Sequence, residues 1–164
     1  GREAIIQHLL EALRGSRFLA VLGSSGSGKS SVVRAGLLPQ LRSGALPFSD
    51  TWSFRVFKPG VHPLEELAVT LAHAQGVRDV LGVLKSLETD ERELHLCVRL
   101  ALQGRPQETR CCIVVDQFEE AFTLCQDHKE REQFIKLLQY AATIAGGQTV
   151  LVLVMRADFL AQAA

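Results

Sequence analysis

The chain lacks several features that would assign it to whole classes of protein. Its 164 residues contain no apolar run near the roughly 18 residues that a membrane span needs. They also do not begin with a basic segment followed by an apolar one, as a secretion signal would. The 18 basic and 18 acidic side chains cancel, so the overall charge indicates neither nucleic acid nor an acidic membrane as a partner. We therefore expect a cytoplasmic protein with neither kind of partner.

Metal-binding patterns of cysteine and histidine are also missing. The four cysteines include no C-x-x-C pair, and two of them, Cys111 and Cys112, are adjacent in an apolar run. The five histidines are scattered and lack the spacing of metal ligands. The sequence has no internal repeat and no low-complexity tract. These absences favour buried cysteine thiols over a zinc site.

Short apolar runs are what the chain does contain, and they alternate with segments of helical periodicity. Four runs are predicted as strands, at 18–22, 52–57, 111–115 and 149–155. The run at 18–22 is apolar throughout, so we expect it to be buried on both sides of a sheet. Such strands alternating with helices predict a mainly parallel sheet covered on both faces, which is a three-layer α/β fold. The length and the 47% hydrophobic content suit a single domain over residues 1–164.

Apolar residues at spacings of three and four predict the helices between these strands. A helix should run from Lys29 toward Leu38, and Pro39 is expected to end or kink it. For 77–103 two interpretations remain, because the pattern fits two helices but the apolar residues of 94–102 also alternate as in a strand. The other predicted helices cover 3–13, 64–72 and 134–145.

A glycine-rich segment follows the first predicted strand directly and leads into the helix that begins near Lys29. Backbone N–H groups of such a turn can approach a phosphate where side chains would collide, and the helix points its positive end at the same place. A flexible Gly/Ser linker with a chance lysine is the alternative, but a strand before and a helix after are the setting of a nucleotide-triphosphate cradle. The predicted phosphate-binding residues are Gly23, Ser24, Ser25, Gly26, Ser27, Gly28, Lys29, Ser30 and Ser31.

Two side chains of this Walker A loop have specific tasks in the predicted site. Lys29 would reach the β- and γ-phosphates and the Ser30 hydroxyl would bind Mg²⁺, whereas Ser31 supports the start of the helix. A carboxylate usually completes such a metal site from the end of a neighbouring strand, and Asp116 ends the apolar run at 111–115. Ser30 and Asp116 are therefore the predicted metal ligands. An aspartate that only caps the following helix is the alternative for Asp116.

Hydrolysis of a triphosphate requires a group that activates water. Gln117 stands where many ATPases keep a catalytic glutamate, and an amide can orient water but cannot take its proton. Glu119 or Glu120 would then be the base, with Glu119 preferred, while a solvated helix face would account for the other glutamate. Arg156 ends the fourth predicted strand, where it would stabilise charge on the γ-phosphate or, alternatively, form a surface salt bridge to Asp158.

Four blocks of the chain resemble the novel STAND NTPases in order and spacing. The first is the Walker A block, Gly-Ser-Ser-Gly-Ser-Gly-Lys-Ser-Ser-Val-Val-Arg-Ala-Gly-Leu-Leu-Pro, over 23–39. The others are Lys-Pro-Gly with Pro-Leu within 58–64, the Walker B block Asp-Gln-Phe-Glu-Glu at 116–120, and Met-Arg-Ala-Asp-Phe-Leu at 155–160. Gly-Arg-Glu at 1–3 is similar to the end of a motif that lies near adenine in related ATPases. The resemblance extends over nearly the whole chain.

The resemblance implies an ATP-dependent signalling switch that uses ATP and Mg²⁺. It implies a P-loop NTPase fold, here interrupted before the last core strand, so we expect the chain to be a fragment of a larger multidomain protein. Members of this family place sensor and effector domains on either side of the NTPase core, and the expected partners are such flanking domains and further copies on activation. The acidic pair at 119 and 120 is similar to the pattern in the wider STAND group.

Two other functions stay open at this point. Phosphate-loop kinases share the same cradle, and a phosphotransferase would need an arginine-rich lid, for which Arg78, Arg92 and Arg99 are the available residues. A module that binds nucleotide without hydrolysing it is suggested by Gln117. ATP is preferred over GTP because no Asn-Lys-x-Asp segment is present.

Overall fold

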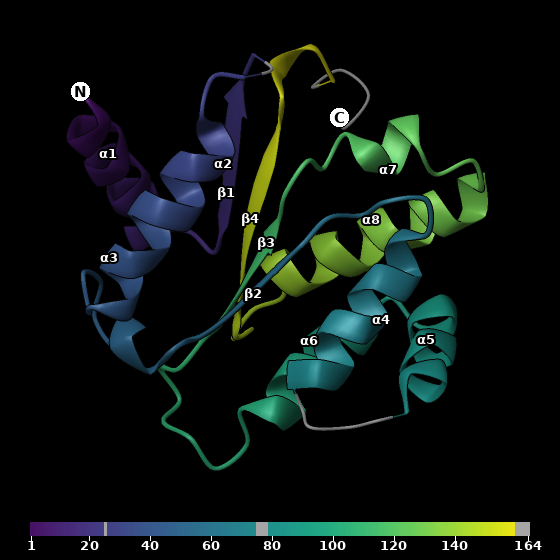
Figure 1. Cartoon of the computed structure of the whole chain (residues 1–164). Helices are drawn as coiled ribbons and strands as arrows, with labels where there is room; N and C mark the ends of the chain where they lie inside the picture. Colours follow the sequence, from purple (N-terminus) through teal and green to yellow (C-terminus); the bar gives the residue numbers. More distant parts are fainter. Residues whose placement is uncertain (25, 75–78, 160–164) are drawn as a thin grey trace.

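A computed structural model describes residues 1–24, 26–74 and 79–159, and these residues form a four-stranded sheet (Figure 1). The strands lie in the order β1-β4-β3-β2, and all three pairings are parallel. The four strands predicted from apolar runs are thus confirmed, as is their parallel arrangement. The strands are β1 (Phe18–Gly23), β2 (Ser53–Phe57), β3 (Cys111–Val115) and β4 (Thr149–Arg156).

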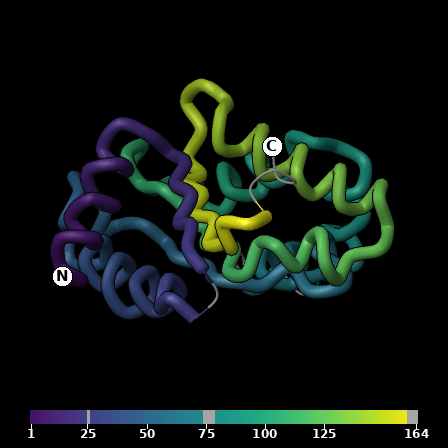
Figure 2. The backbone as a smooth tube through the Cα atoms, turned by 90° about the horizontal axis from the view of Figure 1, so that it is seen from above, coloured from purple at the N-terminus to yellow at the C-terminus, as the bar shows by residue number. Residues whose placement is uncertain are grey.

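Helices cover both faces of this sheet, as the view from above shows (Figure 2). On one face lie α1 (Arg2–Arg14) and a helical segment made of α2 (Lys29–Ser31), η1 (Val32–Leu37) and α3 (Leu38–Arg42). On the other face lie α4 (Pro63–Ala74), α5 (Val80–Thr89), α6 (Glu93–Ala101) and α8 (His128–Thr143). Each layer has its own apolar core against the sheet, which makes the predicted three-layer α/β fold. Short helical turns also form at α7 (Glu120–Thr123), η2 (Ser49–Thr51) and η3 (Ala157–Phe159).

The central strands match the prediction of burial on both faces, but β1 does not. All five residues of β3 are buried, whereas Phe18 and Leu22 of β1 are 43% and 40% exposed. The prediction that 18–22 would be buried on both sides is therefore wrong. The reason is its position, because β1 is an edge strand: Leu19 and Val21 pack into the core beneath α1, while α8 packs against β4 on the opposite face.

The segment 77–103 is helical wherever it is described. Helices α5 and α6 occupy most of it, so the interpretation as two helices is confirmed and the strand over 94–102 is wrong. Helix α6 buries Leu94, Cys97 and Val98, which lie three and four residues apart, and leaves Leu100 exposed. The same residues fit both a period-two pattern and a helical one, and the segment forms a helix, in which one face is buried.

The helix that follows the glycine-rich loop does not end at Pro39. It continues to Arg42, and the six residues before Leu38 form a π-helical stretch in which the Leu38 N–H donates to the Val33 carbonyl. Proline lacks an N–H and its ring conflicts with the carbonyl four residues earlier, so a wider turn lets the helix continue through Pro39. Close packing accompanies it, because a Cβ on Gly36 would lie 2.5 Å from Cδ1 of Ile6 in α1.

The sequence also makes predictions about the cysteines, metal sites and membrane spans. All four cysteines are buried, as predicted, and burial raises the pKa of the Cys111 and Cys112 thiols. Within the described ranges, no three His, Cys, Asp or Glu side chains gather as metal ligands. In the same part of the chain, no helix combines the length and the apolar character that crossing a membrane would require.

Candidate nucleotide-binding site

The glycine-rich loop lies at the carboxyl end of β1 and turns back over that end before the helix begins (Figure 1). Gly26 and Gly28 have φ values of 76° and 82°, a left-handed conformation that favours glycine, as the sequence predicts. Gly23 is closely packed, because a Cβ there would lie 2.7 Å from Oγ of Ser27 and would displace that side chain. Ser25 lies outside the described residues. The loop therefore has the tight backbone that phosphate binding needs.

Lys29 at the start of the helix bends over this loop. Its Nζ donates to the Ser24 carbonyl at 3.0 Å, and the Ser27 N–H donates to the same oxygen at 3.2 Å. The first regular helical bond joins the Val32 N–H to the Gly28 carbonyl at 2.9 Å. The N–H groups before Val32 have no partner within the helix, and they lie where the helix dipole is positive. This end of the helix therefore offers donors to an anion.

Asp116 is brought directly to this helix from the end of β3. Its carboxylate is only 4% exposed, and Oδ1 accepts a hydrogen bond from the Ser30 hydroxyl at 2.7 Å. The two predicted metal ligands, 86 residues apart in sequence, are thus in contact. Asp116 is not the cap of the following helix, which was the alternative. Helix α7 begins at Glu120, its N-cap residue is Glu119, and no side chain makes a capping hydrogen bond there.

Arg34 is a member of this site that the sequence analysis missed. Its Nε and Nη2 donate to Oδ2 of Asp116 at 3.3 and 3.2 Å, forming an ion pair. The signal was available in the spacing, because Arg34 follows Ser30 by four residues and such residues share one face of a helix. Asp116 therefore contacts a hydroxyl through one oxygen and a cation through the other.

Gln117 has an unusual backbone conformation directly after Asp116. Its φ of 53° lies in the left-handed region, which costs a non-glycine residue about 1–2 kcal/mol. This turn brings the Phe118 N–H to the Val154 carbonyl of β4, at 2.9 Å. Gln117 also lines the cavity next to the loop. Strain of this kind is characteristic of functional sites, where surrounding contacts maintain it.

The adjacent glutamates Glu119 and Glu120 point to different places. Glu119 lines the cavity, and its Oε1 accepts the backbone N–H of Arg156 at 3.1 Å. Oε1 of Glu120 instead accepts the N–H of Gly60, in the loop between β2 and α4, at 3.1 Å. Only Glu119 of the two lines the cavity beside the loop. The geometry therefore separates a residue that faces the site from one that anchors a neighbouring loop.

Arg156 reaches the same cavity from the end of β4, but its side chain is engaged elsewhere. Its Nε and Nη2 donate to Asp158 at 3.2 and 2.7 Å, and its guanidinium lies 5.1 Å from the centre of the Phe159 ring. The salt bridge that the sequence offered as an alternative is therefore formed in the structure. Arg156 would have to leave Asp158 to touch a phosphate with its side chain.

A cavity of about 480 Å³ lies beside the loop, a size typical of small-molecule sites. Ser30 and Asp116 contribute a hydroxyl and a carboxylate, the hard oxygen donors that Mg²⁺ prefers. Such an ion usually takes only one or two protein ligands and completes its shell with water and phosphate oxygens. The donor set therefore fits Mg²⁺ carried in with a triphosphate. The cavity is lined by Gly26, Gly28, Lys29, Ser30, Ser31, Asp116, Gln117, Glu119, Val154 and Arg156.

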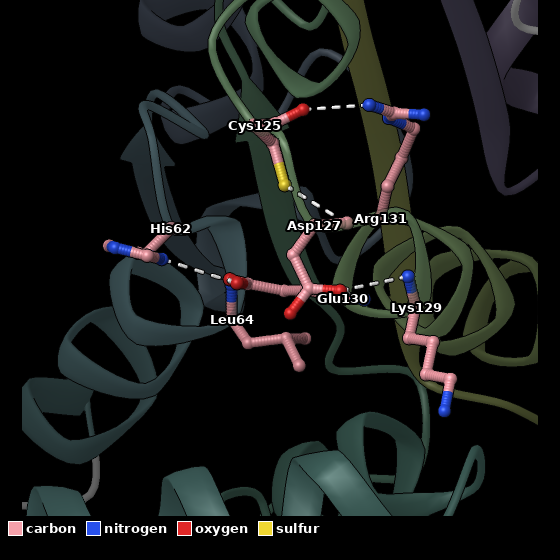
Figure 3. A network of polar contacts seen from close by, with 7 residues as sticks. All are labelled: His62, Leu64, Cys125, Asp127, Lys129, Glu130 and Arg131. Atoms are coloured by element: carbon pink, nitrogen blue, oxygen red, sulfur yellow. Dashed lines mark hydrogen bonds and ion pairs between the residues drawn. The ribbon is translucent and has the colours of Figure 1, made fainter.

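A second polar network ties the loop between β2 and α4 to the start of α8 (Figure 3). Glu130 accepts the N–H of Leu64 at 3.1 Å and pairs with Nδ1 of His62 at 3.2 Å. Asp127 caps α8 by accepting the N–H groups of Lys129 and Glu130. The Glu130 carboxylate raises the pKa of His62. Together with the contact to Glu120, this network anchors the loop to the Walker B side of the site.

Comparisons with known proteins concern the family and the fold of the chain. A family model described as Novel STAND NTPase 1 matches residues 1–164. Among solved structures, the Walker-type ATPase PABY2304 of Pyrococcus abyssi is similar, with 16% identity and a TM-score of 0.55, over 94% of this chain and 45% of that one. That likeness supports the fold, and it confirms the predicted class of P-loop α/β architecture. The search of curated proteins found no match.

A second solved structure is that of the pCW3 conjugation coupling protein TcpA, in a monomer form with ATPγS. The match covers 86% of this chain and 42% of that one, at 19% identity and with a TM-score of 0.39. This chain therefore spans less than half the length of either solved protein.

Proposed function

We propose that this chain, which belongs to the novel STAND NTPase 1 family, is the Mg·ATP-binding switch domain of a larger signalling protein. The observation that carries the proposal is the 2.7 Å hydrogen bond between Ser30 and Asp116 beside a glycine-rich loop. It joins the two halves of a metal–phosphate site that are far apart in sequence. A flexible Gly/Ser linker would not hold a serine against a buried carboxylate at the end of β3.

Phosphate binding falls to the backbone of the loop and to Lys29. The positive φ values at Gly26 and Gly28 belong to the kind of turn in which backbone N–H groups can be directed at an anion. Lys29, which donates to the Ser24 carbonyl, would exchange that partner for the β- and γ-phosphates. Ser30 and Asp116 would hold Mg²⁺, which neutralises negative charge on the phosphates when bound.

Hydrolysis would use residues at the ends of β3 and β4. Glu119 is the proposed base, because it lines the cavity and its carboxylate can accept a proton from water. Gln117 would orient that water through its amide. Glu120, bound to the Gly60 N–H, is proposed as an anchor and no longer as a catalytic residue. Arg156 would stabilise charge on the γ-phosphate after leaving Asp158.

The switch would follow from contacts that exist only with the triphosphate. Glu119 joins the Walker B segment to β4 by accepting the Arg156 N–H. A γ-phosphate that contacts this region would therefore favour one position of the ends of both β3 and β4. Loss of the γ-phosphate would then release them and change how the domain meets its neighbours. Flanking sensor and effector domains, self-association on activation and a cytoplasmic setting belong to this proposal.

Replacing Lys29 with alanine tests nucleotide binding. A unit charge about 4 Å from a phosphate is worth up to about 4 kcal/mol at an effective dielectric constant near 20. Lys29 must give up its bond to Ser24 when it binds a phosphate, so its net contribution to affinity is smaller than this upper value. We therefore expect Lys29→Ala to weaken ATP affinity by about 30- to 300-fold, since 1.4 kcal/mol corresponds to about tenfold. Lys85→Ala on α5 removes the same charge from an exposed position outside the cavity and should leave affinity unchanged. Equal affinity in Lys29→Ala would contradict the proposed site.

A module that binds ATP without hydrolysing it is the second candidate. Gln117 favours it, because it occupies the position of the usual catalytic glutamate. The phosphotransferase alternative gains no comparable observation, since Arg92 is paired with Asp90 at 3.0 Å and Arg78 lies outside the described residues. Phosphate release by the purified domain with ATP alone would separate hydrolysis from simple binding, and phosphorylation of an added acceptor would favour the phosphotransferase.

A further inference from the structure

The two carboxylate oxygens of Asp116 are held in different ways. Oδ1 accepts the Ser30 hydroxyl proton at 2.7 Å, and a hydroxyl that donates its proton still has lone pairs for a cation. This contact can therefore persist when a metal binds Ser30. Oδ2 is taken by Nε and Nη2 of Arg34 at 3.3 and 3.2 Å. A cation of the protein itself thus occupies the carboxylate oxygen that the metal or its water shell would use.

We propose that Arg34 acts as a built-in counter-ion that competes with Mg²⁺ for Asp116. In the metal-free protein Arg34 neutralises Asp116, and on arrival of the Mg·nucleotide it gives up Oδ2. This inference rests on the proposed function, because it assumes that Ser30 and Asp116 form the metal site. It assigns to Arg34 control over how strongly nucleotide binding depends on the metal.

The burial of the two partners supports the competition. The Asp116 side chain is 4% exposed, and a buried carboxylate without a partner is strongly disfavoured. Arg34 is 48% exposed, so its guanidinium can turn into water at little cost once another cation has taken its place. The pair is therefore asymmetric, because Asp116 needs a cation and Arg34 does not need Asp116.

The position of Arg34 on its helix makes it sensitive to the metal. It lies in the π-helical stretch one turn after Ser30, so both side chains reach Asp116 from the same helix. Two cations on one carboxylate repel each other, and this repulsion is weakly screened beside a buried group. Bound Mg²⁺ would therefore weaken the contact of Arg34 even if the guanidinium stayed nearby. Removing the arginine charge should make metal binding easier.

The test is the metal dependence of nucleotide affinity in the variant Arg34→Gln. The quantity is the ratio of the Kd for a fluorescent ATPγS analogue in EDTA to the Kd in excess Mg²⁺. We expect this ratio to rise about three- to tenfold, the range of a half-exposed charged hydrogen bond. Arg42→Gln is the matched control, because Arg42 lies on the same helical segment, 4.9 Å over the Phe54 ring, and should leave the ratio unchanged.

Thermal unfolding provides a second readout that a merely structural arginine would not produce. In EDTA without nucleotide, Arg34→Gln should lower Tm by about 2–4 °C, because the buried Asp116 carboxylate loses its charged partner and keeps only the Ser30 hydroxyl. With Mg·ATPγS bound, the variant and the wild type should unfold at the same temperature. Arg34→Lys keeps the charge without two donors to Oδ2 and should fall between the two in both measurements.

Several results would overturn the competition. A lower ratio in Arg34→Gln would mean that Arg34 orients Asp116 for the metal, and an unchanged ratio would mean that it has no influence on it. An equal loss of Tm with and without Mg·ATPγS would identify a purely structural pair. A wild-type protein that binds no nucleotide would contradict the proposed function itself, and the inference about Arg34 with it.

Discussion

Replacing Glu119 with glutamine should stop ATP hydrolysis while leaving ATP binding intact. The substitution removes the only group that we assign to accept a proton from the attacking water. Glutamine keeps an Oε1 acceptor, so the 3.1 Å hydrogen bond from the Arg156 N–H can persist. The fold and the position of β4 are therefore expected to remain unchanged, and the effect should be confined to chemistry.

The size of the effect follows from what remains in the cavity. A positioned general base contributes about 10²–10⁴ in rate, which is roughly 2.7–5.4 kcal/mol on the activation barrier. Gln117 still lines the cavity and can orient water in the variant. We therefore expect the lower half of this range, a loss of about 100- to 1000-fold in the rate of a single turnover.

The neighbouring glutamate provides the matched control. Glu120→Gln makes the same change of charge one residue away, and its Oε1 can still accept the Gly60 N–H at 3.1 Å. Because Glu120 is not among the residues that line the cavity, hydrolysis should continue within about twofold of the wild-type rate. Single-turnover phosphate release measures the rate, and fluorescence of a labelled ATP measures binding. Normal turnover in Glu119→Gln, or its loss in Glu120→Gln instead, would refute the assignment of the base.

Two further predictions concern the backbone conformation of Gln117 and the ion pair between His62 and Glu130. Gln117→Val should destabilise the protein by about 1–2 kcal/mol, because a β-branched residue resists the left-handed φ of 53° more than glutamine does. Gln117→Gly should be as stable as wild type or up to about 1 kcal/mol more stable in urea unfolding, because glycine relieves the strain of this conformation but adds entropy to the unfolded chain. Glu130 raises the pKa of His62 above its ordinary 6.5, so the protonated form is favoured in the fold. The stabilisation from this pair is then complete below pH 6.5 and disappears as the pH rises through the higher folded pKa. The Tm difference between wild type and His62→Gln should accordingly be larger at pH 5.5 than at pH 8, and a constant difference would contradict it.

Much of the site was predictable because its parts are local in sequence. The conformations of Gly26 and Gly28 follow from the absence of a Cβ, and Lys29 and Ser30 follow them at the start of a helix. Asp116 was predictable from its place after an apolar run, since the carboxyl ends of parallel strands meet at one edge of a sheet. The roles of these residues with nucleotide remain predictions, but the structure brings them together as that reasoning requires.

Other features could not be predicted because they depend on which elements become neighbours. The apolar run at 18–22 looks like a central strand, yet its exposure depends on β1 lying at the edge of the sheet. The alternating leucines of α6 fit a strand until the packing of one helical face decides between them. Neither choice is contained in the segment itself, because the free energy of burial depends on the rest of the chain.

The sequence by itself determined the chemistry of the loop, since glycine conformations, a helix start and a lysine are local properties of 23–30. Tertiary structure alone decided the partners of the charged groups. It directed Glu119 into the cavity and Glu120 to Gly60, and it placed Arg34 on Asp116. The physical reason is that a side chain's contacts depend on where distant strands end, and one residue along a turn changes the direction in which a carboxylate points.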